Sequence, residues 1–350
     1  MSPLAGRRLG LLVWAGLVPS LAVVGLASTG CKGTCRPGGD EVVIYTSVDQ
    51  VFSAPVFWEF ERRTGIRVRA VFDTEETKST GVVNRLIAEA ARPQADLFWS
   101  NDPVRQLLLV QRGLVEAYLS PNAAGIPPEF RSADGAWTGF AARARILLVN
   151  KELVPDADVP RSLRDLADPR WRGRFAIANP LFGTTTMHVA ALFDAWGEAE
   201  ARAFLDSLKA NGVRIASSNG EVKRLVVAGE VAIGLCDTDD GNEALEEGAP
   251  VEIVYPDQDG TGTLVMPTTV VIIRGGPHPD AARRLVDYLL TAGVEQTMAE
   301  QAAHMPLRPG VPAPPGVRPV TGLRAMKVDY GRVATEMERI QPWLQEWVGL

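Results

Sequence analysis

The feature that most constrains the fold is an alternation of short apolar runs and amphipathic segments, which occurs twice along the chain. Residues 42–113 contain three runs with the length and boundaries of strands, each followed by apolar residues at helical spacing. The alternation restarts at Phe175 and continues to Cys236. Strands that alternate with helices of this size predict mainly parallel sheets, with ligand-facing loops at the carboxyl ends of the strands.

Two longer apolar segments, residues 137–150 and 263–274, lie on either side of the second alternation. Each is suited to a strand that passes from one α/β unit to the other. The sequence therefore predicts an α/β protein with two lobes, a hinge and an interlobe cleft that closes on a ligand. We expect lobe 1 to comprise residues 41–138 plus 264–308, and lobe 2 to comprise residues 139–263 plus 309–350.

The first thirty residues have the layout of a secretory signal. Arg7 and Arg8 are their only charges, and a low-polarity stretch follows up to Gly30. A run of this length is also long enough for a membrane anchor, since about 20 apolar residues span a bilayer. The segment before Cys31 resembles a bacterial lipoprotein cleavage site. We expect residues 1–30 to be removed, Cys31 to carry lipid and residues 31–40 to form a linker, with ordinary cleavage nearby as the alternative.

Charge and cysteine content exclude several classes of function. Removal of residues 1–30 takes away two of the 36 basic groups and no acidic group, which leaves 34 against 42 and a net charge of −8. This balance argues against a nucleic-acid partner. Cys236 is the only cysteine beyond the leader region, which excludes an internal disulfide framework and a cysteine zinc site.

Three aspartates, Asp237, Asp239 and Asp240, directly follow the apolar run that ends at Cys236. Carboxylates at this spacing repel one another, so something must offset their repulsion. In the simplest interpretation they lie in a solvated loop, and Asp239 or Asp240 caps the next helix. A strand followed by Asp-x-Asp also resembles the nucleophile motif of phosphatases of the haloacid-dehalogenase type. That interpretation needs a downstream lysine and further magnesium ligands, but Lys327 is the only lysine beyond Asp240.

Hydroxyl and amide residues stand at the start of several predicted helices, where backbone N–H groups and the helix dipole attract anions. Ordinary helix capping is the alternative explanation. The residues concerned are Ser79, Thr80, Gly183, Thr184, Thr185 and Asn219.

The order of the segments resembles that of the solute-binding proteins of bacterial ABC importers, in particular the ferric-iron-binding group. The resemblance covers nearly all of residues 41–308. It is carried by VVIYTSVDQ, FERRTGIRV, RLIAEAARPQADLFWSND, LRDLADPRWRGRFAIANP, GEVAIGL and MPTTVVIIRGGPHPDAARRLVDYLL. It implies a periplasmic-binding-protein type II fold, a monomer without catalysis or cofactor, permease and ATPase partners, and a location in the periplasm or on the outer face of the membrane.

The resemblance also implies positions for a ligand, although the residues there differ. The histidine that follows the first strand in some members corresponds to Asp49, and the glutamate after the third strand corresponds to Asn101 or Asp102. The paired tyrosines of ferric sites correspond to Asp239 and Asp240, so the phenolate ligands are missing.

The anion-holding positions of the group are better preserved. Gly183, Thr184, Thr185 and Asn219 match them, whereas an asparagine of the group corresponds to Asp237. Ser47, two residues before Asp49, completes the set of residues predicted to contact the ligand.

The resulting hypothesis is that Asp49 from one lobe and Asp239 and Asp240 from the other meet across the cleft. Their oxygen atoms suit a hard cation carried as cargo, with Fe(III) first and Ca²⁺ or Mg²⁺ as alternatives. An organic cation suits carboxylates equally well. In the opposing alternative, a phosphorylated or phosphonate solute docks on the threonines, and the aspartates bind its hydroxyl groups.

Overall fold

The computed structural model describes residues 41–73 and 80–349. The predicted signal segment, Cys31, the linker and Ser79 lie outside these residues, so their assignments remain predictions. Within the described residues, no helix combines the length and the apolar character needed to cross a bilayer.

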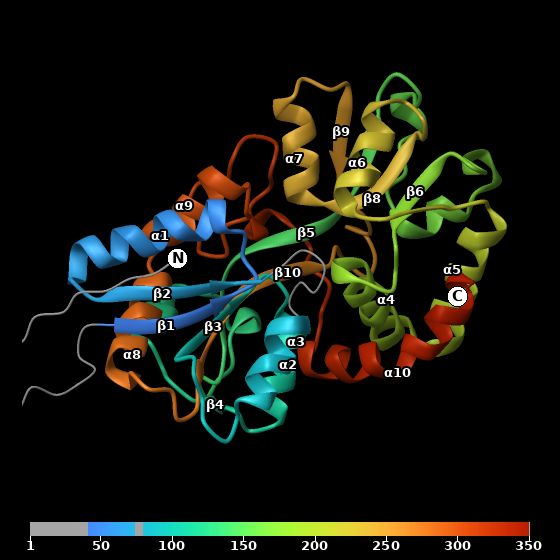
Figure 1. The fold of residues 1–350 in the computed structure, drawn as a ribbon. Helices are drawn as coiled ribbons and strands as arrows, with labels where there is room; N and C mark the ends of the chain where they lie inside the picture. The colour runs from blue at the N-terminus through green and yellow to red at the C-terminus, as the bar shows by residue number, and fades with distance from the viewer. Residues whose placement is uncertain (1–40, 74–79, 350) are drawn as a thin grey trace, which may run out of the picture. The chain divides into compact units, whose positions relative to one another are not determined.

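Ten strands form one mixed sheet, in the order β2-β1-β3-β10-β5-β8-β6-β7, with β4 paired to β10 and β9 paired to β5 (Figure 1). The strands are β1 (Glu41–Thr46), β2 (Arg67–Phe72), β3 (Leu97–Ser100), β4 (Val115–Glu116), β5 (Thr138–Asn150), β6 (Phe175–Ala178), β7 (Arg214–Ala216), β8 (Ile233–Asp237), β9 (Val251–Val254) and β10 (Val265–Ile273). β1 is parallel to β2 and β3, and β6 is parallel to β7 and β8, so two parallel groups are joined through the antiparallel pair β5 and β10.

Helices follow most strands, as the alternation predicts. They are α1 (Gln50–Thr64), α2 (Thr80–Ala88), α3 (Pro103–Gln111), α4 (Gly183–Trp196), α5 (Glu198–Ala210), α6 (Asn219–Val227), α7 (Thr238–Glu246), α8 (Pro279–Leu289), α9 (Ala292–Ala302) and α10 (Tyr330–Val348). Local signals set their ends. Asp102 accepts hydrogen bonds from the N–H groups of Val104 and Arg105 at the start of α3, and Gly65 ends α1 with a φ of 72°.

In the first parallel group, adjacent residues of a strand face opposite layers of the core. Ile44 and Leu97 pack in the cluster that contains side chains of α1, α8 and α9. Tyr45 and Phe98, their neighbours in the chain, pack with side chains of α2 and α3. The period of two therefore explains why apolar residues run continuously through these strands, which are covered on both faces.

The second parallel group is built in the same way. Ile177 and Leu235 pack with apolar side chains of α4, α5 and α10. Ala176 and Cys236 belong to the cluster that contains Val222 and Val226 of α6. Cys236 is fully buried and free, which places it in the core as part of an apolar strand.

Strand β5 connects the two groups and changes its partner along its length. Residues 138–144 pair with β10 on one edge, and residues 145–149 pair with β8 on the other. Near its start, Ala141 adopts a φ of 61°, and its N–H donates to the buried carboxylate of Glu295 at 3.3 Å. Glu295 also accepts from the backbone N–H groups of Leu307 and Arg308, and it faces the Arg308 guanidinium at 3.1 Å. This buried network fixes the bend at the start of the crossing strand.

The predicted α/β class is confirmed, and the two longer apolar segments form β5 and β10. Strands β4 and β9 and the 19-residue helix α10 were not predicted, although Asp329 caps α10 by accepting from Gly331 and Arg332. The residue boundaries of the two predicted lobes remain a prediction.

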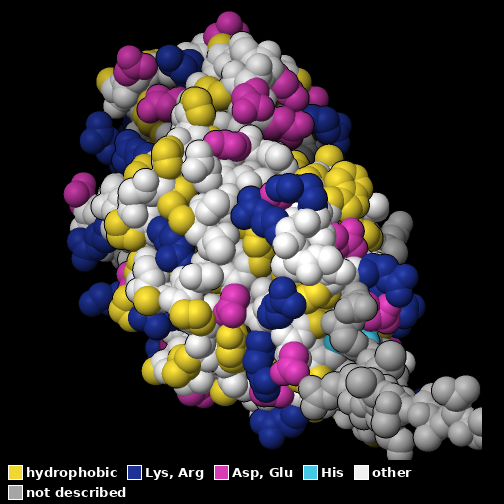
Figure 2. Space-filling view, turned by 90° about the vertical axis from the view of Figure 1, so that its left-hand side faces the viewer, with side chains coloured by type: hydrophobic (Ala, Val, Ile, Leu, Met, Phe, Trp, Pro, Cys, Tyr) yellow, Lys and Arg dark blue, Asp and Glu magenta, His cyan; other side chains and the backbone are white. Residues whose placement is uncertain are grey.

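The surface carries no large apolar patch on the face drawn in Figure 2, where charges of both signs are interspersed with small groups of hydrophobic side chains. Two of the exposed large hydrophobic residues, Val51 and Trp58, lie on α1, and the others lie elsewhere in the chain: Leu119, Leu153, Phe182 and Ile215.

Candidate ligand-binding site

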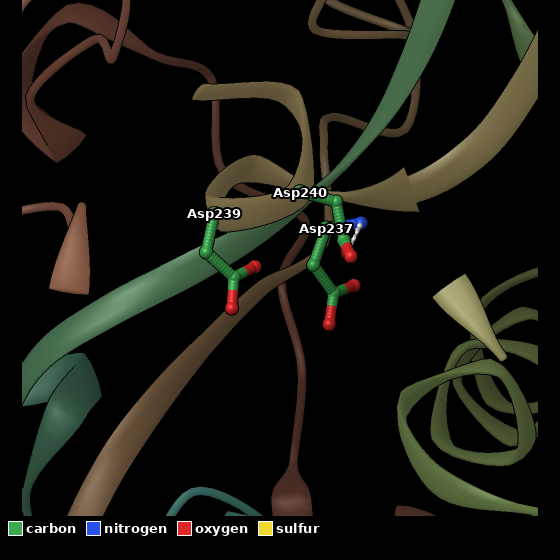
Figure 3. A group of neighbouring side chains, drawn as sticks. All are labelled: Asp237, Asp239 and Asp240. Carbon is green, nitrogen blue, oxygen red and sulfur yellow. Dashed lines mark hydrogen bonds between the residues drawn. The ribbon is translucent and has the colours of Figure 1, made fainter. Parts of the chain in front are cut away.

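The three aspartates lie at the junction between β8 and α7. Asp237 ends the strand, and Asp239 and Asp240 belong to the first turn of the helix. The Asp240 carboxylate accepts a hydrogen bond from the Asp237 N–H at 3.2 Å, drawn dashed in Figure 3. The N-cap residue of α7 is therefore the buried Asp237, not Asp239 or Asp240 in a solvated loop as the simplest interpretation predicts, and Asp240 completes the capping box from within the helix.

The carboxylates nevertheless converge. In Figure 3 the side chains of Asp237 and Asp239 point to the same side of the ribbon. One oxygen atom from each of the three aspartates lies within 4.8 Å of the other two, which is close enough for shared contact with a metal ion. Asp239 Oδ1 is buried and has no hydrogen-bond partner among the described residues.

Arg145 of β5 supplies the first of two internal cations. It lies directly opposite Asp237 in the antiparallel register of β5 and β8, and it is fully buried. Its NH1 group donates to Asp237 Oδ1 at 2.6 Å and to Thr184 Oγ1 and Asn219 Oδ1, each at 3.1 Å. Its NH2 group donates to Thr185 Oγ1 at 3.3 Å. This guanidinium therefore joins β8 to the first turns of α4 and α6.

Arg143, two residues earlier on the same face of β5, supplies the second cation. Its NH1 group lies 3.1 Å from Asp237 Oδ2 and 3.5 Å from Asp239 Oδ2. Its NH2 group donates to the carbonyl oxygen of Asn101 at 3.2 Å. Arg143 thus links the aspartates of the second parallel group to the turn that follows β3 in the first.

Sequence reasoning missed both arginines, and they change the electrostatic balance of the site. The sequence-based hypothesis was that a bound ligand offsets the repulsion among the aspartates. In the structure, guanidinium groups already pair with both oxygens of Asp237. The available signal was the pattern of two arginines, two residues apart, inside the apolar segment that forms β5. Such residues must face a buried counter-charge.

The predicted anion-holding residues are brought together around Arg145. Thr184 donates to Asp237 Oδ2 at 3.0 Å and accepts from Asn219 Nδ2 at 3.0 Å. Gly183, with a φ of 60°, is the first residue of α4, and Phe182 at the N-cap forms no side-chain cap. Arg145 Nε is buried without a hydrogen-bond partner among the described residues. The unused Nε donor of Arg145 therefore lies near the N-terminus of α4, where backbone N–H groups also favour an anion.

The residues predicted from the first half of the chain lie at the ends of β1 and β3. Ser47 Oγ is 3.1 Å from Ser100 Oγ and accepts from the Asn101 N–H at 3.3 Å. Asn101 is further held by Thr268, whose hydroxyl donates to its side-chain oxygen at 3.0 Å. Asp49 immediately precedes α1. Its predicted meeting with Asp239 remains a prediction.

Two other residues predicted to contact the ligand lie at the starts of helices, and their contact with a ligand remains a prediction. Asp102 is buried, caps α3 and lies 3.4 Å from the Arg105 guanidinium, so its carboxylate serves the helix. Thr80 is the first residue of α2.

Burial and mutual repulsion raise the pKa of the Asp239 and Asp240 carboxyls. Burial raises the pKa of Asp239, although Arg143 opposes this shift. Burial, followed by the charges of Asp239 and Asp237, raises the pKa of Asp240 well above its usual range. Burial alone would lower the pKa of Arg143, but the three aspartates raise it above its ordinary value, so it stays charged. Two guanidinium groups therefore face three carboxyls, and Asp239 and Asp240 hold their protons to higher pH than ordinary aspartates.

The neighbouring histidines add no positive charge. Burial and the charge of Arg143 lower the pKa of His304 to about 3. Burial and the charge of Arg145 lower the pKa of His188 well below its usual range. Both imidazoles are therefore neutral at physiological pH, which agrees with the structural role predicted for them.

Comparison with known proteins adds a family and a fold. Residues 92–320 match the family model described as bacterial extracellular solute-binding protein. The crystal structure of iron-bound HitA from Pseudomonas aeruginosa has a TM-score of 0.78 and 26% sequence identity, and covers 89% of this chain and 100% of that chain.

Two curated relatives are named for chemically different solutes. The Fe(3+)-binding periplasmic protein of Serratia marcescens is 27% identical and covers 83% of this chain and 86% of its own length. The putative 2-aminoethylphosphonate-binding periplasmic protein of Salmonella typhimurium is 24% identical and covers 93% of both chains.

Proposed function

The chain belongs to the family of bacterial extracellular solute-binding proteins, and from this premise we propose that it captures ferric iron, or another hard cation, for an ABC importer. This membership confirms the class predicted from the sequence. The protein works outside the cytoplasm, without catalysis of its own, and delivers its cargo to permease and ATPase subunits. Closure of two lobes around the cargo supplies the signal that the permease reads.

The observation that carries the proposal is the convergence of three carboxylate oxygens within 4.8 Å. Asp237 is held by two arginines at 2.6 and 3.1 Å, whereas Asp239 has only a longer contact with Arg143, at 3.5 Å, so Asp239 and Asp240 are the carboxylates best placed to bind a cation. Asp239 Oδ1 is buried and unpartnered, and the pKa of both carboxyls is raised. A bound cation would give Asp239 Oδ1 a partner and would favour the ionised form of both carboxyls. Asp49 completes the oxygen set from the first half of the chain.

Relatives support this cargo. Iron binding is stated in the names of a curated relative and of a solved structure that cover most of the chain. The tyrosine ligands of ferric sites are replaced by Asp239 and Asp240, which still provide hard oxygen donors that suit Fe(III). The groups around Arg145 would hold an oxyanion that completes the coordination of the metal.

The decisive experiment is native mass spectrometry with elemental analysis on protein purified without a chelator. We expect one trivalent metal ion for each chain, and its removal by a chelator should lower the melting temperature. Protein that carries no metal, and gains no stability from added ferric citrate, would contradict the proposed cargo.

The raised pKa values of Asp239 and Asp240 predict a pH dependence of cation binding. Asp239 and Asp240 hold protons to higher pH than ordinary aspartates, and a cation must displace those protons. Affinity should therefore rise with pH through the raised pKa range and level off above it. Isothermal titration calorimetry in buffers of different ionisation enthalpy should detect proton release. Proton uptake, or affinity that rises as the pH falls, is the opposite of this expectation.

A second candidate cargo is a small phosphonate or phosphorylated solute. It is favoured by the buried guanidinium of Arg145, which contacts Thr184, Thr185 and Asn219 and retains an unused Nε donor. Such donors match a tetrahedral oxyanion, and Asp239 and Asp240 would then bind an ammonium or hydroxyl group. Calorimetry with 2-aminoethylphosphonate on metal-free protein separates the two candidates. Only the phosphonate candidate requires tight binding in the absence of metal.

The phosphatase alternative has weaker support. It assigns Asp237 as nucleophile, but guanidinium groups lie against both of its carboxylate oxygens. A carboxylate held in this way is a buried structural anion rather than a free nucleophile.

A further inference from the structure

Arg143 and Arg145 differ in how firmly the protein holds them. The Arg145 side chain has no exposed surface and donates to side chains of four residues. The Arg143 side chain keeps 14% of its surface exposed, and its ion pair with Asp237 is longer, at 3.1 Å against 2.6 Å for Arg145. Arg145 is therefore part of the core, whereas Arg143 lies at the accessible edge of the cluster.

Arg143 also lies where a bound cation would be placed. Its NH1 group contacts the Oδ2 atoms of both Asp237 and Asp239, which are two of the three carboxylates that converge. A metal ion held by the same carboxylates would have this guanidinium as a close neighbour of like charge. Repulsion between them in a partly buried site is strong, because little water screens it. The two cations therefore compete for the same carboxylates.

We propose that Arg143 is an internal counter-cation that occupies the aspartate cluster in the unloaded protein, and that an incoming cation must displace it. This inference rests on the proposed binding of a cation at Asp239 and Asp240. Displacement costs the same for every cargo, so Arg143 lowers the affinity for all cations and leaves the cluster closed to those that bind weakly. It also releases the carbonyl of Asn101, so loading breaks a contact between the two parallel groups of the sheet.

The test compares Tb³⁺ and Ca²⁺, which have similar radii and the same preference for oxygen but differ in charge. Tb³⁺ affinity is measured by its sensitised luminescence, and Ca²⁺ affinity by competition for the same site. Arg143→Met removes the guanidinium at similar length, and Arg143→Lys retains the charge. Arg62→Met removes an equal charge from an exposed site that pairs only locally with Glu59 and is the matched control. Circular dichroism verifies folding, and Arg143→Gln replaces the methionine variant if that variant does not fold.

We expect Arg143→Met to bind both ions at least tenfold more tightly, by similar factors, with the lysine and Arg62 variants close to the parent protein. Unchanged or weaker binding in the methionine variant overturns the inference. A much larger gain for Tb³⁺ than for Ca²⁺ also overturns it, because the guanidinium would then remain beside the bound ion. The proposed function is judged separately, from iron binding by the parent protein, so that either can fail alone.

Discussion

Asp237→Asn is expected to lower the free energy of unfolding by about 3–5 kcal/mol, the usual cost of removing one partner of a buried ion pair. Asp237 is fully buried, and its two oxygens face Arg145 at 2.6 Å and Arg143 at 3.1 Å. The amide has no charge, so the buried Arg145 guanidinium would lose its nearest counter-ion. Urea denaturation followed by far-ultraviolet circular dichroism at pH 7 measures the loss.

Asp240→Asn is the matched control, and its effect should have the opposite sign. Burial and neighbouring charges raise the pKa of Asp240 in the folded state. A carboxyl with a raised folded pKa stabilises the fold at low pH, and this contribution is lost as the pH rises through the folded pKa. At pH 7 the neutral amide should therefore stabilise the ligand-free protein, while its side-chain oxygen can still accept from the Asp237 N–H. Equal destabilisation by both variants would contradict this electrostatic account.

Joint replacement of Asp239 and Asp240 by asparagine should abolish stabilisation by a cation and weaken its binding by roughly a thousandfold or more, about 4 kcal/mol. The two carboxylates proposed to bind the cation lose their charge, and Asp239 loses its pair with Arg143, whereas the ion pairs of Asp237 remain. The expected result is a folded protein whose melting temperature no longer responds to ferric citrate or Tb³⁺. Differential scanning fluorimetry and Tb³⁺ titration provide the measurements.

Asp280→Asn provides the control for that pair, because its side chain is 83% exposed at the start of α8. It removes a negative charge without touching the cluster, so cation affinity should not change. Cation affinity retained by the Asp239 and Asp240 double variant would refute this site, although membership in the solute-binding family would stand.

The fold was largely predictable because each signal acts locally. Continuous apolar runs marked buried strands, and Asp102 with Pro103 marked the start of α3, where the structure places them. Helix α10 escaped prediction although its apolar residues Val333, Met337 and Ile340 have helical spacing. Pro342 inside this helix and its many charged residues make the sequence pattern less clear.

The site was only half predictable, for a physical reason. The end of an apolar strand locates Asp237, Asp239 and Asp240, since that information lies in adjacent residues. Their counter-ions lie more than ninety positions away, and only the antiparallel register of β5 and β8 places Arg145 opposite Asp237. A period of two cannot specify which strands become neighbours. Two arginines in an apolar strand indicate that a buried anion lies nearby, but the sequence alone does not tell which residue supplies that anion.

Both guanidinium groups project from one strand whose two halves are bonded to different neighbours. Because side chains alternate along a strand, inserting a single residue before Arg143 would turn both arginines to the opposite face and remove them from the aspartates. Evolution can readily lengthen a surface loop, but it has no such freedom here. The charge facing the aspartates is therefore best altered by exchanging side chains on an unaltered backbone, which makes positions 143 and 145 natural starting points for engineering the charge of the solute.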